Sequence, residues 1–138
     1  MTVNTLSRVA WWMVGCGMLS GAVLGLWSFA GPVPAPTGFI AYDDLPRRLL
    51  RLAHIAMIAL PLLCLELERW LENTSLTAQR RDRVRRALVF GILALPTLLA
   101  VTAYWSPALY LLPLPVCSLM GSVFAVAIAL GRTPQVYP

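Results

Sequence analysis

The longest charge-free segment of this chain covers 45 residues, from 87 to 131, and a second covers residues 9–30. A helix rises about 1.5 Å per residue, so about 20 residues cross the roughly 30 Å hydrocarbon core of a bilayer. The longer segment therefore suits two crossings joined by a tight turn. Only 12% of the residues are charged, against about 25% in a typical soluble domain. These features predict an all-α integral membrane protein with a single domain over residues 1–138.

Turn signals divide the chain into four predicted transmembrane helices. Interface aromatics and a proline at 104–107 mark the turn inside the longer segment. Prolines exclude a helix from the loop before Asp44, and Asp44 and Pro46 are typical of a helix start. Pro61 and Pro96 predict kinks. The approximate spans are 9–30, 46–68, 83–104 and 109–131, with an irregular segment or short helix at 107–113.

The arginines predict the orientation of this antiparallel bundle. Basic residues concentrate in the loop 69–86, and such loops are retained in the cytoplasm. Four spans then place both termini in the cytoplasm and the loop 31–45 outside, as in a multi-pass protein of a bacterial inner membrane. Because the arginines border apolar spans, we expect them to contact anionic lipids or partner subunits rather than nucleic acid. The cytoplasmic group comprises Arg80, Arg81, Arg83, Arg85 and Arg86.

Three further arginines lie on the predicted outer side, against the usual distribution of positive charge. They are Arg47, Arg48 and Arg51. We expect them to pair with Asp43 and Asp44 or with acidic groups of a partner.

Small residues spaced by four mark one face of the first helix. Gly17, Gly21 and Gly25 share this face, which predicts close helix packing in lipid, either within the chain or against a partner subunit.

His54 is the only histidine, and it lies about 4.5 Å deeper in the membrane than Arg51 by the rise of a helix. An ionisable residue at that depth is a candidate functional site. His54 could form a structural hydrogen bond to a neighbouring helix. It could also ligate haem, with Met57, Met120 or another chain supplying the second ligand. A third interpretation is contact with a quinone or proton transfer, with Arg51 as a positive neighbour.

Catalytic machinery is not evident. The chain has no nucleophile–base motif, phosphate loop or metal-ligand spacing, and Cys16, Cys64 and Cys117 are interpreted as small buried apolar side chains. Near the inner end of the second span, Glu66 and Arg69 are helical neighbours. No catalytic residue and no metal site is predicted, so we do not expect an enzyme complete within this chain.

These features favour a small accessory or structural subunit of a larger membrane complex, preferentially an energy-converting redox complex. One alternative is an electron-transfer subunit that binds haem or quinone through His54 and Arg51, although a cofactor held by this chain alone is not expected. A second alternative is a small oligomeric transporter, which the absence of a carboxylate from the first span disfavours.

Overall fold

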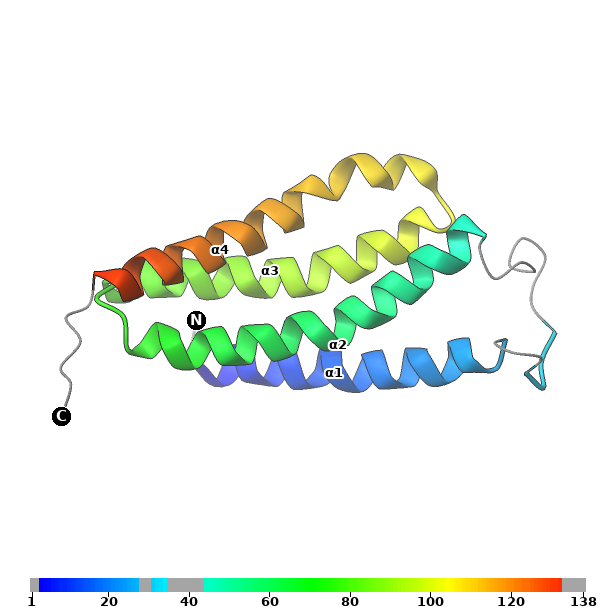
Figure 1. The fold of residues 1–138 in the computed structure, drawn as a ribbon, viewed down its shortest axis with the longest axis horizontal. Coiled ribbons are helices and arrows are strands. Elements are labelled where there is room, and N and C mark those ends of the chain that lie inside the picture. Colours follow the sequence, from blue (N-terminus) through cyan, green and yellow to red (C-terminus); the bar gives the residue numbers. More distant parts are fainter. Residues whose placement is uncertain (1–2, 28–30, 35–43, 133–138) are drawn as a thin grey trace.

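The computed structural model describes residues 3–27, 31–34 and 44–132, and this part of the chain contains helices and no strand (Figure 1). The helices are α1 (Val3–Gly25), α2 (Leu45–Glu72), α3 (Ala78–Thr102), the 3-10 helix η1 (Ser106–Leu111) and α4 (Pro113–Gly131).

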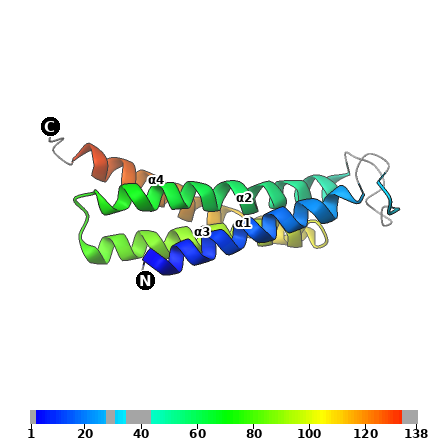
Figure 2. The same cartoon turned by 90° about the horizontal axis from the view of Figure 1, so that it is seen from below.

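The helices form an up-and-down bundle in which each α-helix packs against the next one along the chain. The α2–α3 connection, the start of α1 and the end of α4 lie at the same end of the bundle (Figure 1). Seen from below, α1 runs along α2 and approaches α3 at its N-terminal end (Figure 2). The antiparallel arrangement therefore agrees with the predicted one.

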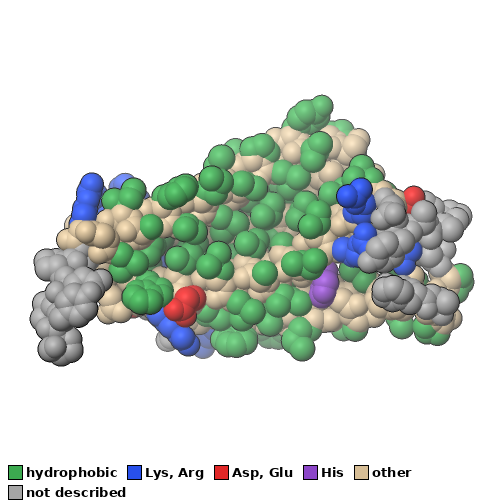
Figure 3. Space-filling model, in the orientation of Figure 1, with side chains coloured by type: hydrophobic (Ala, Val, Ile, Leu, Met, Phe, Trp, Pro, Cys, Tyr) green, Lys and Arg blue, Asp and Glu red, His purple; other side chains and the backbone are tan. Residues whose placement is uncertain are grey.

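Three helical segments are long and apolar enough to cross a membrane. They are α2 and α3, each with mean hydropathy 1.8, and η1 with α4 over Ser106–Gly131, with mean hydropathy 2.1. Side chains between the two charged ends of the molecule are predominantly hydrophobic (Figure 3). An integral membrane protein is thus indicated.

Helix α1 is not among these candidate spans. Its first two turns carry Asn4, Thr5, Ser7 and Arg8, and its second half is rich in glycine, so its most apolar stretch is less apolar than those of α2, α3 and α4. The prediction of four spans therefore holds by length and composition for three of the helices.

Several local signals act as predicted at the helix starts. Asp44 occupies the N-cap position of α2, with a proline in the first turn, although the Asp44 side chain makes no capping bond. Thr77 caps α3, and its side chain accepts a hydrogen bond from the Arg80 N–H at 3.4 Å. Because arginine favours helix, α3 begins at Ala78, ahead of the predicted span.

Buried apolar side chains of all four α-helices form the core. Pro61 and Pro96 are fully buried within α2 and α3, and α2 bends along its length in Figure 1. The 3-10 helix η1 occupies the predicted irregular segment before Pro113. The core cluster consists of Leu6, Ala10, Cys64, Leu71, Val84, Leu88, Ile92, Leu119 and Val126.

Candidate functional site

His54 joins α2 to α1 inside the apolar part of the bundle. Its Nδ1 lies 2.8 Å from the carbonyl oxygen of Gly17 and 3.3 Å from Ser20 Oγ. Ser20 Oγ donates to the same Gly17 carbonyl at 2.8 Å. The half-buried ring is thus held by two polar groups of the neighbouring helix, and it makes no bond to Arg51 among the described residues.

These contacts define the tautomer of His54. A carbonyl oxygen only accepts hydrogen bonds, so Nδ1 carries the hydrogen and donates it to Gly17. In the neutral ring, Nε2 then carries the lone pair. Histidines that ligate metals commonly have this arrangement, in which a backbone carbonyl holds one ring nitrogen and the other nitrogen ligates.

Glycine at position 21 makes room for the ring. A Cβ added at Gly21 would lie 2.9 Å from His54 Nε2 and 3.0 Å from Nδ1, closer than real side chains approach. At Gly17 an added Cβ would lie 3.1 Å from the Cβ of Met57. Gly25 has nothing within 4 Å. Two features that were identified separately in the sequence, the glycine face and the histidine, therefore meet in one internal contact.

The predicted outer arginines lie at the start of α2. Arg47 donates to the backbone carbonyl of Trp27 at 2.5 Å, which ties α2 to the residues just after α1. Arg48 is exposed, and Arg51 and Asp44 are half-buried. Asp43, the other predicted acidic partner, lies outside the described residues.

A buried ion-pair network joins α2 to α3 at the opposite end. Arg85 Nε donates to Glu68 Oε1 at 2.8 Å, and its NH2 group lies 2.5 Å from Glu72 Oε1. The side chains of Arg85 and Glu68 are only 12% and 6% exposed. Glu68 Oε2 is buried and has no hydrogen-bond partner among the described residues. Sequence interpretation missed this network and assigned Arg85 to lipid or partner contacts.

The remaining arginines at this end of the bundle differ in their surroundings. Arg86 pairs with Asp82 along α3, and Arg69 pairs with Glu66 at 3.3 Å, as the helical spacing predicted. Arg80 and Arg83 line a cavity of about 390 Å³ together with Arg132, a residue that sequence interpretation did not include in the site. Arg80 and Arg83 lie in the first two turns of α3, and Arg132 follows the end of α4.

The cysteines do not gather into a site. Cys64 is buried as expected, whereas Cys16 and Cys117 are exposed on the outside of the bundle, where an apolar thiol suits lipid. Across the described ranges, no group of three or more His, Cys, Asp or Glu residues is placed to hold a metal ion.

Comparison of this chain with family models, curated proteins and solved structures found no match.

Proposed function

We propose that the protein is a four-span inner-membrane protein with both termini in the cytoplasm, and that α1 is the fourth span. Its 23 residues are enough for a crossing at about 1.5 Å per residue. Gly17 and Gly21, which lower its hydropathy, are covered by α2. Arg8, the one charged residue within α1, lies near its start at the arginine-rich end. The positive-inside rule then supports a cytoplasmic location for that end.

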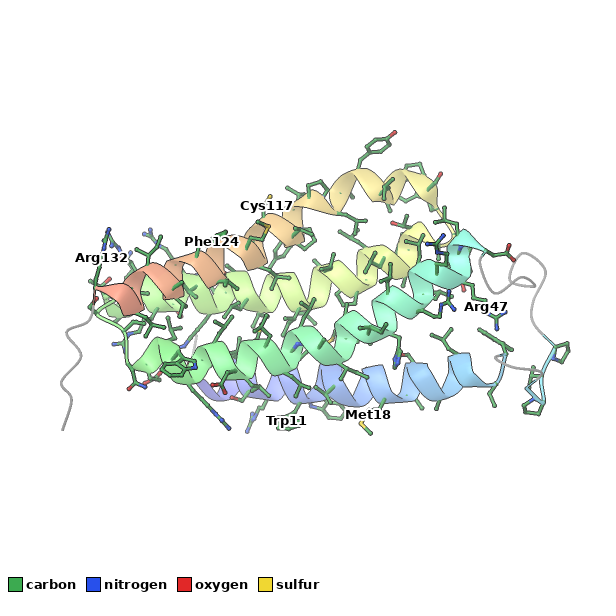
Figure 4. All side chains as sticks on the ribbon, in the orientation of Figure 1. Trp11, Met18, Arg47, Cys117, Phe124 and Arg132 are labelled. Carbon is green, nitrogen blue, oxygen red and sulfur yellow. The ribbon has the colours of Figure 1, made fainter. Side chains whose placement is uncertain are left out.

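We further propose that the chain works as an accessory subunit of a larger membrane complex, and the outer face of α1 carries this proposal. Trp11 and Met18 are 61% and 66% exposed, and both point away from the bundle (Figure 4). Gly15 on the same helix has nothing within 4 Å of an added Cβ. An exposed helix face with an open glycine is better covered by another protein helix than by lipid, because small residues permit close packing.

Purification of the full-length chain from its native membrane in mild detergent tests this proposal. We expect stoichiometric partner subunits in the wild-type preparation, identified by mass spectrometry, and their loss in Gly15→Leu. Gly131→Leu is the matched control, because Gly131 is also open but lies at the end of α4. A chain that purifies alone as a small homo-oligomer would contradict the proposal and favour a transporter.

The host complex that we prefer is an energy-converting redox complex, and His54 is the reason. With Nδ1 bonded to Gly17, the Nε2 lone pair of the neutral ring is the atom that would ligate a haem iron. This geometry supports a second candidate function, an electron-transfer subunit that binds its cofactor through His54.

A reduced-minus-oxidised visible spectrum of the same preparation separates the two candidates. Partner subunits without a haem band support the accessory role. A haem band that disappears in His54→Ala but persists in Ser20→Ala would support the cofactor role instead, since Ser20 only assists the hydrogen bonding of the ring.

A further inference from the structure

The cavity at the arginine-rich end is lined by both basic and apolar side chains. Arg80 and Arg83 of α3 and Arg132 after α4 supply three guanidinium groups around about 390 Å³. The hydroxyl-bearing residues Ser75 and Thr77 also line it. The other lining residues are apolar: Leu76, Val84, Ala125, Ile128 and Ala129.

Within the described residues, the three guanidinium groups have no acidic partner. No carboxylate pairs with Arg80, Arg83 or Arg132 in the part of the chain that the structure describes, whereas Arg69, Arg85 and Arg86 each have an acidic partner. Like charges gathered around one cavity repel each other, and an anion bound between them relieves that repulsion. Arginine holds phosphate oxygens through paired hydrogen bonds, so a phosphate group suits this site.

A groove of small side chains continues from the cavity along the α3–α4 interface. It is a second cavity of about 260 Å³ that shares Arg83 and Val84 with the first and is also lined by Ala87, Cys117, Ser118, Gly121 and Ser122. Both serine hydroxyls donate to backbone carbonyls. A Cβ added at Gly121 would meet nothing within 4 Å, so small side chains leave this groove open. A free phosphate ion bound by the arginines would leave this groove empty, whereas an acyl chain would fill it.

We propose that this face binds one phospholipid with an anionic headgroup. Arg80, Arg83 and Arg132 hold the phosphate, and one acyl chain lies in the groove beside Cys117 and Gly121. The site is at the end of the bundle where α3 passes from charged to apolar residues, which is the depth of the headgroup region. Basic pockets between transmembrane helices on the cytoplasmic side are known to recognise anionic lipid headgroups.

The test measures binding of phosphatidylglycerol to the full-length chain in neutral detergent, by native mass spectrometry, with phosphatidylcholine as the reference lipid. Each of Arg80→Gln, Arg83→Gln and Arg132→Gln should weaken phosphatidylglycerol binding about fivefold, the usual contribution of one arginine near anionic lipid. Arg81→Gln is the matched control, since Arg81 carries the same charge in the same helix turn but does not line the cavity. It should change the affinity less than about twofold.

Two further measurements separate a lipid from a soluble anion. Gly121→Leu should weaken phosphatidylglycerol binding while all three arginines remain, because the added side chain occupies the groove. Inorganic phosphate alone should raise the unfolding temperature less than phosphatidylglycerol does at equal concentration. Equal losses in Arg81→Gln and Arg83→Gln would overturn the proposal in favour of diffuse attraction to the membrane surface. Stabilisation by phosphate equal to that by the lipid, or full binding in Gly121→Leu, would also overturn it.

Discussion

Glu68 is the one charged residue among the buried residues that the structure describes, and its carboxylate depends on Arg85. Removing one partner of a buried pair costs about 3–5 kcal/mol when the other charge is left uncompensated. In Glu68→Gln, Arg85 keeps Glu72 as a partner, so we expect a smaller loss of unfolding free energy, about 1–3 kcal/mol in detergent, measured by denaturant titration. The matched control is Glu66→Gln, because the Glu66–Arg69 pair is exposed and worth about 0–1 kcal/mol.

A double variant separates lost pairing from lost packing at this network. In Glu68→Leu with Arg85→Leu no unpaired buried charge remains, so much of the stability should return, as when apolar residues replace buried ion pairs elsewhere. If Glu68→Gln and Glu66→Gln destabilise the protein equally, Glu68 is solvated in the membrane-bound chain and the buried network is wrong.

Residue contacts within one helix were predictable from the sequence, and contacts between helices were not. The spacing of three between Glu66 and Arg69 places them on adjacent positions whatever the helix packs against. The pairing of Glu68 with Arg85 depends on how α2 and α3 are rotated about their axes. Hydrophobic pattern constrains that rotation weakly when most faces of a helix are apolar, as they are here.

At the scale of helices, the α1–α2 contact depends on Gly21. In Gly21→Ala the added Cβ would lie 2.9 Å from His54 Nε2, so the ring or the helix must move. Overpacking of this kind costs about 1–3 kcal/mol, and we expect a corresponding fall in unfolding temperature in detergent. Gly15→Ala is the matched control on the same helix, where an added Cβ meets nothing within 4 Å, and it should be neutral or stabilising.

Combining this substitution with His54→Ala identifies the group responsible. Removing the ring vacates the space that the new methyl group needs, so the cost of Gly21→Ala should largely disappear in the His54→Ala background. Additive costs would show instead that the backbone of α1, and not the imidazole, sets the limit at position 21.

Helix identity was predictable from the sequence more accurately than helix ends. The charge-free segment at 9–30 indicates which residues can lie in lipid, and this boundary differs from the start of the helix. Helix α1 begins earlier, at Val3, because polar residues such as Asn4, Thr5 and Arg8 can also form the backbone hydrogen bonds of a helix. Where a specific residue marks the backbone, as Pro46 does, the predicted helix start agrees with the structure, whereas α3 begins at Ala78, ahead of the predicted span.

For the whole molecule, arginine placement and helix connectivity are mutually consistent. The chain folds up and down, so the start of α1, the α2–α3 connection and the end of α4 share one end (Figure 1). Every arginine except Arg47, Arg48 and Arg51 belongs to that end in sequence. At the other end, Arg47 donates a hydrogen bond to the backbone carbonyl of Trp27. This structural role explains one of the three arginines that depart from the positive-inside rule, without an acidic group from a partner subunit.

Cysteine labelling tests this topology, including the crossing by α1. Thr5→Cys, Val33→Cys and Ser75→Cys introduce thiols in the first turn of α1, after α1 and after α2, and all three positions are exposed. With a membrane-impermeant maleimide and intact cells, Val33→Cys should label, while Thr5→Cys and Ser75→Cys should label only after permeabilisation. The wild-type chain is the control, because its cysteines lie within the helices and should not react. Labelling of Ser75→Cys in intact cells would reverse the orientation. Labelling of Thr5→Cys and Val33→Cys from the same side would show that α1 lies on the membrane and does not cross it.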